Sequence, residues 1–265
     1  MKKNLIVSII ALAILSILIV AGVRQSRYQA ENIVEGQVTH VPYSFSRPFA
    51  PTYFNFYHEA ANELYRAFFE ETYLSDVNDP TSTVTVSAII YDERGRVTTP
   101  GAIRPMQRVQ IGWDFQPTDA HGGETEVIRF VRILKSKFKL NEIYLFFAEG
   151  YLDRAAAISV ENAELLTPAQ KEELIRLCED TAGKTLPLVT YREVNGKKGY
   201  YDENDQLYDG DKGKLIFSGR TDEEGNHYVH VSLYYAPLGA YGYNIRLHDE
   251  GHGRWSVLNS SNYIS

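Results

Sequence analysis

The longest uninterrupted hydrophobic stretch of the chain lies near its N-terminus. Leu5 to Val23 contains no charged residue, and a helix of that length, at about 1.5 Å per residue, spans about 28 Å, which is close to the hydrocarbon thickness of a bilayer. Lys2 and Lys3 precede this stretch, and positively charged flanks tend to stay in the cytoplasm. The pattern predicts a single-pass anchor over residues 1–23 in the cell membrane, with the body of the protein outside the cytoplasm.

A cleaved signal peptide is the alternative interpretation. The small residues of Val20-Ala21-Gly22 resemble a cleavage site, and cleavage there would leave a secreted or periplasmic body. The uncharged run is longer than the core of most signal peptides, which has about 7 to 15 residues. An uncleaved anchor is therefore preferred, and under both interpretations the body operates in the bacterial envelope or beyond it.

The next segment, residues 24–51, is polar and carries no hydrophobic periodicity. Three prolines disfavour helix before each of them: Pro42, Pro48 and Pro51. We therefore expect an extended stalk over 24–51 and a folded extracytoplasmic domain over 52–265. The domain has a possible subdivision near 150–166, where Ala155–Ala157 favour helix and Ile158–Val160 favour strand.

Two segments of the body repeat apolar residues at intervals of three and four, which is typical of amphipathic helices. The first is predicted over about 54–74, and the second between Glu124 and Lys139. The apolar positions are Phe54, Tyr57, Ala61, Leu64, Tyr65 and Phe68 in the first, and Val127, Phe130, Val131, Leu134 and Phe138 in the second.

A third helix has the clearest start signal in the chain. Thr167 is followed by proline at the first helical position and by Gln170 at the third, which is a capping box. Gly183 is a natural end, so we expect a helix between these residues.

Other segments alternate apolar and polar residues with a period of two or are rich in β-branched residues, which predicts strands. Strands are expected at 82–91 and 107–115, and a short buried strand at 142–147. Five more follow in the C-terminal part: Leu186–Val194, Lys214–Arg220, His227–Tyr235, Tyr241–Asp249 and Arg254–Asn259. Short glycine-containing turns separate them and leave no room for crossover helices, which predicts an antiparallel β-meander.

The predicted fold class is α+β, with long amphipathic helices packed on a mostly antiparallel sheet after an N-terminal transmembrane helix. Composition adds two restrictions. The formal net charge of −7 disfavours nucleic-acid binding, because an acidic body repels the phosphate backbone. Cys178, the one cysteine, cannot form an internal disulfide, and its place on the apolar side of a predicted helix indicates a buried structural thiol.

Two groups of residues could bind a metal. The first group offers oxygen ligands of the kind calcium takes, in a glycine-containing loop: Asp202, Asn204, Asp205, Asp209 and Asp211. Its spacing differs from that of an EF-hand, so a solvated acidic hairpin is the preferred interpretation. His248 and His252 are four residues apart, as in helical zinc sites, but Gly251 and Gly253 indicate a surface turn instead.

A cluster of tyrosines is the candidate for ligand binding. Tyr234, Tyr235, Tyr241 and Tyr243 surround a Pro-Leu-Gly turn, and tyrosines at a strand-loop junction can form a rigid contact surface. Packing in the core on alternate strand faces is the competing interpretation.

No catalytic motif is found, so no catalytic residue is assigned. No cofactor is predicted, and calcium at the acidic loop is the one alternative. The leading hypothesis is a non-enzymatic, membrane-anchored extracytoplasmic module that binds an envelope protein or glycan through its tyrosines. One alternative is an envelope hydrolase that uses His248, His252 or carboxylates assembled by the fold, with or without a metal. The other is a subunit of a secretion or transfer assembly.

Overall fold

The chain folds into two compact units in a computed structural model that describes residues 28–42, 52–74, 83–117, 123–208, 213–235 and 239–264. Unit 1 comprises the chain up to Ile103 together with Arg108–Leu134. Unit 2 comprises Arg104–Gln107 and Lys135–Ser265. Each unit has a hydrophobic core of its own.

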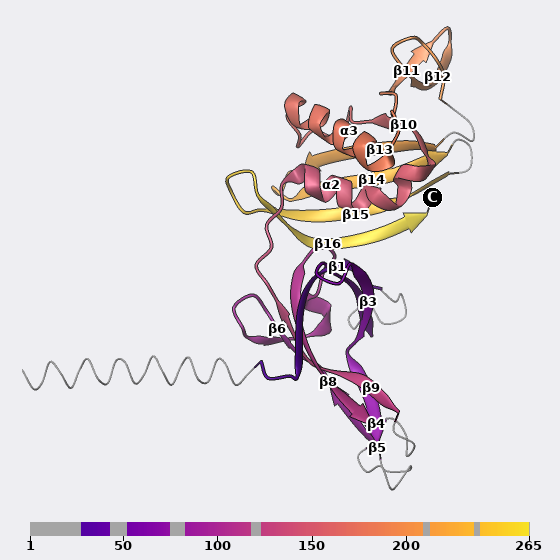
Figure 1. The fold of residues 1–265 in the computed structure, drawn as a ribbon. Helices are drawn as coiled ribbons and strands as arrows, with labels where there is room; N and C mark the ends of the chain where they lie inside the picture. Colours follow the sequence, from indigo (N-terminus) through magenta and orange to yellow (C-terminus); the bar gives the residue numbers. More distant parts are fainter. Residues whose placement is uncertain are drawn as a thin grey trace, which may run out of the picture. The chain divides into compact units, whose positions relative to one another are not determined.

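Unit 1 is built on a seven-stranded sheet with the order β3-β2-β1-β8-β9-β6-β7 (Figure 1). Neighbouring strands are antiparallel except β6 and β9, which run parallel. A hairpin of β4 and β5 forms a separate two-stranded sheet that contacts β8 and β9. The strands are β1 Asn32–His40, β2 Tyr53–His58, β3 Glu63–Phe68, β4 Glu70–Leu74, β5 Thr83–Ser87, β6 Ile89–Tyr91, β7 Val97–Thr98, β8 Arg108–Pro117 and β9 Glu124–Ile133.

The core of unit 1 lies on the inner face of this sheet. Phe54 of β2, Ile111 of β8 and Val131 of β9 are almost completely buried there. Phe54 also packs against Phe56 and Phe69, with ring centroids 6.0 and 5.4 Å apart. Strand alternation, which sends every second side chain to one face, explains why β2 buries Phe54 and Phe56 together.

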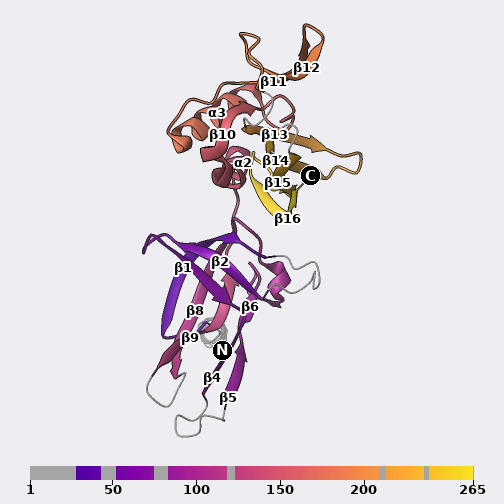
Figure 2. The ribbon, with the colours of Figure 1, turned by 90° about the vertical axis from the view of Figure 1, so that its right-hand side faces the viewer.

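Unit 2 is a five-stranded sheet with the order β10-β13-β14-β15-β16, covered on one face by two α-helices (Figure 2). β10 pairs with β13 in parallel, and the later strands form an antiparallel meander. A hairpin of β11 and β12 turns at Asn195-Gly196, where both residues have positive φ. The elements are α2 Leu140–Ala148, β10 Ala155–Ser159, α3 Pro168–Ala182, β11 Thr190–Val194, β12 Lys197–Tyr201, β13 Gly213–Thr221, β14 His227–Tyr235, β15 Gly239–Asp249 and β16 Trp255–Ile264.

The core of unit 2 fills the space between the helices and the sheet. Tyr144 of α2 packs edge-on against Phe217 of β13, with ring centroids 5.4 Å apart, and donates a 2.9 Å hydrogen bond to the carbonyl of Ser218. Leu174 and Cys178 of α3 are buried in the same cluster. The predicted burial of the cysteine is confirmed.

Several predicted elements of unit 2 are also confirmed. Thr167 caps α3 by accepting a hydrogen bond from the backbone N–H of Gln170, and Gly183 ends the helix in the left-handed conformation. The meander of β13 to β16 agrees with the strands predicted from period-two alternation. Strand β8 likewise corresponds to the strand predicted at 107–115.

The helix predicted at 54–74 is wrong. This segment forms β2, β3 and β4, with a turn over 59–62 that brings β3 antiparallel to β2. Asn62 closes the turn with a φ of 57°, a left-handed conformation that asparagine tolerates better than most residues. The apolar spacing of three and four therefore arises from two strands on either side of a turn.

The helix predicted between Glu124 and Lys139 is also wrong, because β9 occupies most of it. The strand predicted at 142–147 is wrong in the opposite sense, since these residues belong to α2. In the ambiguous 150–166 segment, a short 3₁₀ helix (Glu149–Arg154) leads into β10.

The α+β prediction with long amphipathic helices is therefore wrong. The described part of the chain is mainly β, and its two α-helices have 9 and 15 residues. Residues 32–40, within the segment expected as a stalk, form β1 between β2 and β8. The anchor predicted at Leu5–Val23 lies outside the described residues, and no helix that is described has the length and apolar character needed to cross a bilayer.

Candidate functional site

The four tyrosines chosen from the sequence do not share one face of the unit 2 sheet. The pairing of β14 with β15 places Tyr235, Tyr241 and Tyr243 on the helix-covered face and Tyr234 on the opposite face. Tyr243 packs on Phe147, with ring centroids 5.2 Å apart. Tyr241 is the most exposed of the four, at 41%.

Tyr234 and Tyr235 have separate surroundings. Tyr235 packs against the core of unit 2. The ring of Tyr234 lies 6.0 Å from that of Tyr200 and 5.1 Å from the ammonium of Lys214. Core packing, one of the two interpretations made from the sequence, therefore describes Tyr235 and Tyr243. A ligand-binding role for the four tyrosines stays a prediction.

The acidic group near residue 202 is used mainly in local structure. Oδ1 of Asp202 accepts hydrogen bonds from the backbone N–H groups of Asn204 and Gln206, at 2.9 and 2.8 Å. Asp205 forms a 2.7 Å ion pair with Arg192. The remaining two candidates, Asp209 and Asp211, lie outside the described residues.

His248 is exposed near the end of β15, where it pairs with Ser256 of β16, and His252 is exposed in the turn between the two strands. His252 has a φ of 54°, so it belongs to the turn rather than to a helical face. Within the described ranges, no three His, Cys, Asp or Glu side chains come together in a way that could hold a metal ion.

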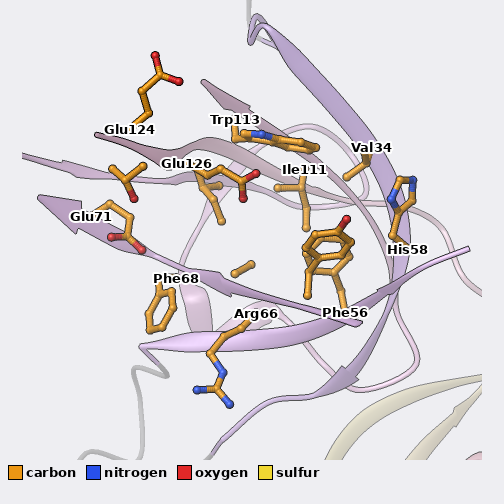
Figure 3. A pocket seen from close by; sticks show the side chains of 14 residues that line it. Val34, Phe56, His58, Arg66, Phe68, Glu71, Ile111, Trp113, Glu124 and Glu126 are labelled. Carbon is orange, nitrogen blue, oxygen red and sulfur yellow. The ribbon is translucent and has the colours of Figure 1, made fainter. Parts of the chain in front are cut away.

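The structure shows a different candidate site, a pocket of about 330 Å³ on the inner side of the curved unit 1 sheet (Figure 3). This volume is within the range of small-molecule sites, at its lower end. The lining side chains come from five neighbouring strands of the seven-stranded sheet, β3, β2, β1, β8 and β9, and from β4 of the adjacent hairpin.

Aromatic rings form much of the pocket wall. Phe56 and Tyr65 face each other across β2 and β3 and stack, with ring centroids 5.5 Å apart and an interplanar angle of 21°. In Figure 3 the Trp113 ring lies on the other side of Ile111 from Phe56. Nε1 of Trp113 is buried and has no hydrogen-bond acceptor among the described residues. The wall therefore offers apolar ring faces and one unused N–H donor.

Glu124 and Glu126 line the pocket because of a bulge in β9. Gly112 of β8 is opposite Phe130, but the next residue, Trp113, is opposite Ile128, so Arg129 is an extra residue in β9. On the C-terminal side of the bulge, the inward-facing residues of β9 have odd numbers, and on its N-terminal side they have even numbers, which include Glu124 and Glu126. Arg129 itself turns to Asp114, with which it forms a 3.0 Å ion pair.

The carboxylate of Glu126 points toward the middle of the group drawn in Figure 3, while Glu124 extends away from it. Glu71 of β4 adds a third carboxylate to the lining. Burial raises the pKa of Glu71 above its ordinary value of 4.5, because desolvation disfavours the charged form. The site is thus acidic, and one of its acids is partly desolvated.

The one arginine that lines the pocket directs its charge elsewhere. Arg66 alternates with Tyr65 and Ala67 on β3, so its guanidinium lies on the outer face, 4.6 Å from the centroid of the Tyr53 ring. Its Nε donates a 3.4 Å hydrogen bond to Asn55. His58 lies at the edge of the pocket (Figure 3).

This arrangement suits a ligand that is both apolar and positively charged. Ring faces attract an organic ammonium group through the ring quadrupole, and nearby carboxylates add direct charge attraction. The apolar spacing of β2–β3 and of β9 predicts helices, on which these side chains would point in unrelated directions, so the sequence pattern does not reveal the site. The one usable signal was the alternation of Glu124, Glu126 and Ile128.

Comparison with protein families, curated proteins and solved structures found no match for this chain. The functional conclusion therefore depends on the site itself.

Proposed function

We propose that the protein is a membrane-anchored extracytoplasmic binding module, and that the unit 1 pocket recognises an amine-bearing apolar group. A lysine side chain of an envelope protein or a small organic amine has this chemistry. The observation that carries the proposal is the lining of the pocket, in which aromatic rings and three carboxylates are combined. The uncharged stretch Leu5–Val23 supports the anchoring.

Charge and geometry both favour a cation over an anion. Glu71, Glu124 and Glu126 contribute three negative charges to the lining, whereas Arg66 is engaged on the outer face. An anionic ligand would meet repulsion from these carboxylates. A neutral apolar ligand would fill the ring-lined part but leave the carboxylates without a partner.

The test is calorimetric titration of the full-length protein in detergent with benzylamine and with benzyl alcohol. The two probes share a ring and differ in the charged group. We expect saturable binding of benzylamine and binding of benzyl alcohol that is about tenfold weaker, since a partly exposed ion pair together with a cation–π contact is worth about 1 to 2 kcal/mol.

Glu126→Gln should weaken benzylamine binding about fivefold and leave benzyl alcohol binding unchanged, because it removes a carboxylate and keeps the shape. Glu31→Gln is the matched control, since Glu31 is exposed in unit 1 and does not line the pocket. Equal losses in the two variants, or equal affinity for the two probes, would show that the pocket does not select a cation.

A further inference from the structure

The helices α2 and α3 cover one face of the unit 2 sheet (Figure 2). Side chains of the other face line a second concavity, of about 560 Å³. Its polar lining comes from β13, β14, β15 and the segment after β10: Asn162, Glu164, Arg220, Tyr228, His230 and Asn244. We call this concavity the sheet groove. None of these residues was singled out as a site by the sequence pattern.

One end of the sheet groove is built by a close approach of side chain to backbone. A Cβ on Gly242 would lie 2.8 Å from Cε1 of Tyr263 and 2.9 Å from Cβ of Ser232. The absence of a side chain at Gly242 therefore lets the Tyr263 ring of β16 cross β15 and reach β14. There its hydroxyl lies 2.6 Å from Nε2 of His230.

His230 is held in one orientation from both sides. Its Nδ1 lies 2.7 Å from Oδ1 of Asn244, and its ring stacks on that of Tyr263 with centroids 4.9 Å apart. Because Oδ1 of Asn244 can only accept, Nδ1 of His230 carries the proton, and Nε2 accepts from the Tyr263 hydroxyl. The NH₂ group of Asn244 then has no partner among the described residues and is available to a ligand.

The opposite wall carries charges of both signs. Gly219 of β13 pairs with the chain on either side of Ala163, accepting from the Glu164 N–H at 3.1 Å and donating to the Asn162 carbonyl at 2.9 Å. This pairing fixes the position of Asn162 and Glu164 beside Arg220. Within the described part of unit 2, neither the Glu164 carboxylate nor the Arg220 guanidinium has an ion-pair partner.

We propose that the sheet groove is a saccharide-binding site for a neutral pyranose. A simple anion would be repelled by Glu164, and a simple cation by Arg220. Hydroxyl groups, which donate and accept at the same time, satisfy a carboxylate, a guanidinium and two amides together. The Tyr228 ring supplies an apolar surface for a sugar face. This site is in addition to the amine pocket of unit 1 and does not depend on it.

The experiment is calorimetric titration of the full-length protein with three neutral trisaccharides: N,N′,N″-triacetylchitotriose, cellotriose and maltotriose. We expect saturable binding of at least one of them. Asn244→Ala and Arg220→Gln should each weaken that binding about tenfold, since each removes hydrogen bonds to the ligand. Asn262→Ala and Arg254→Gln are the matched controls, because both residues are exposed in unit 2 and neither lines the groove.

Three results would overturn the proposal. The first is that none of the trisaccharides binds at about 10 mM, and the second is that the Asn244→Ala and Arg220→Gln variants bind as strongly as the natural protein. The third is that inorganic sulfate or a simple dicarboxylate binds in the groove and competes with the sugar, which would make it an anion site. Glu126→Gln should leave the saccharide affinity unchanged, so a failure here is distinguishable from a failure of the amine pocket.

Discussion

The side chain of Glu71 has opposite effects on ligand binding and on stability: the charged carboxylate attracts a cationic ligand, whereas the neutral form is favoured in the folded protein. Its carboxylate contributes to the acidic lining of the unit 1 pocket, and burial raises its pKa above 4.5. A group whose pKa is higher in the folded state favours folding in its protonated form. The protonated Glu71 carboxyl stabilises the fold fully at pH values below its pKa in the unfolded chain. This stabilisation is lost as the pH rises through its pKa in the folded protein.

We therefore expect Glu71→Gln to be more stable than the natural protein at pH 7, with a difference that disappears toward pH 4. The measurement is the free energy of urea unfolding at several pH values between 4 and 7. Glu70→Gln is the control, because Glu70 is the exposed neighbour. A difference that is independent of pH, or that grows as the pH falls, would contradict the assignment.

Cys178 gives a prediction about reactivity. Burial raises the pKa of its thiol to about 12, so the reactive thiolate is scarce at neutral pH. We expect Ellman's reagent to label Cys178 only as fast as the protein unfolds, and fully in urea. Rapid labelling of the folded protein would show that the thiol is accessible.

At the scale of elements, the β9 bulge explains both the site and a failed prediction. The buried residues of β9 include Val127, Ile128, Phe130, Val131 and Ile133. Their spacing resembles that of a helix because the bulge at Arg129 interrupts the period of two and because both faces of the strand are covered. The periodicity of the sequence cannot distinguish a helix from a bulged strand, because the position of the bulge is set by the pairing of β9 with β8.

Elements whose signals are local were predicted well. The capping box of α3 depends on contacts within four residues, and the meander depends on short turns between neighbouring strands. The pocket depends on the pairing of five strands that are far apart in the sequence, with β1 in the middle, and no short stretch of sequence determines that pairing. The sheet groove likewise depends on Gly242, whose importance appears only when Tyr263 is placed beside it.

Gly112 tests the packing next to the bulge. A Cβ at this position would lie 2.2 Å from Cε1 of Phe130, whose side chain is buried and cannot easily move. We expect Gly112→Ala to lower the free energy of unfolding by about 1 to 3 kcal/mol, as overpacking substitutions do. Gly150→Ala is the control, because nothing lies within 4 Å of its Cβ. Equal stability of the two variants in urea would contradict the packing.

The whole chain combines a predicted N-terminal anchor, an acidic net charge and two units with separate candidate sites. The net charge of −7 attracts cationic ligands, and this attraction becomes weaker as added salt screens it.

The predicted anchor over residues 1–23 can be tested by membrane extraction. Full-length protein should remain with membranes after alkaline carbonate extraction, and a variant that lacks residues 1–23 should not. Recovery of the intact full-length chain in the soluble fraction would contradict the anchor.

If the unit 1 pocket holds an amine-bearing apolar group as proposed, the position of a bound amine can be measured directly by NMR. In the presence of benzylamine, we predict intermolecular nuclear Overhauser effects between the benzyl ring protons and the rings of Trp113 and Phe56, which line that pocket. Contacts to other residues, or no contacts at saturating benzylamine, would contradict the claim.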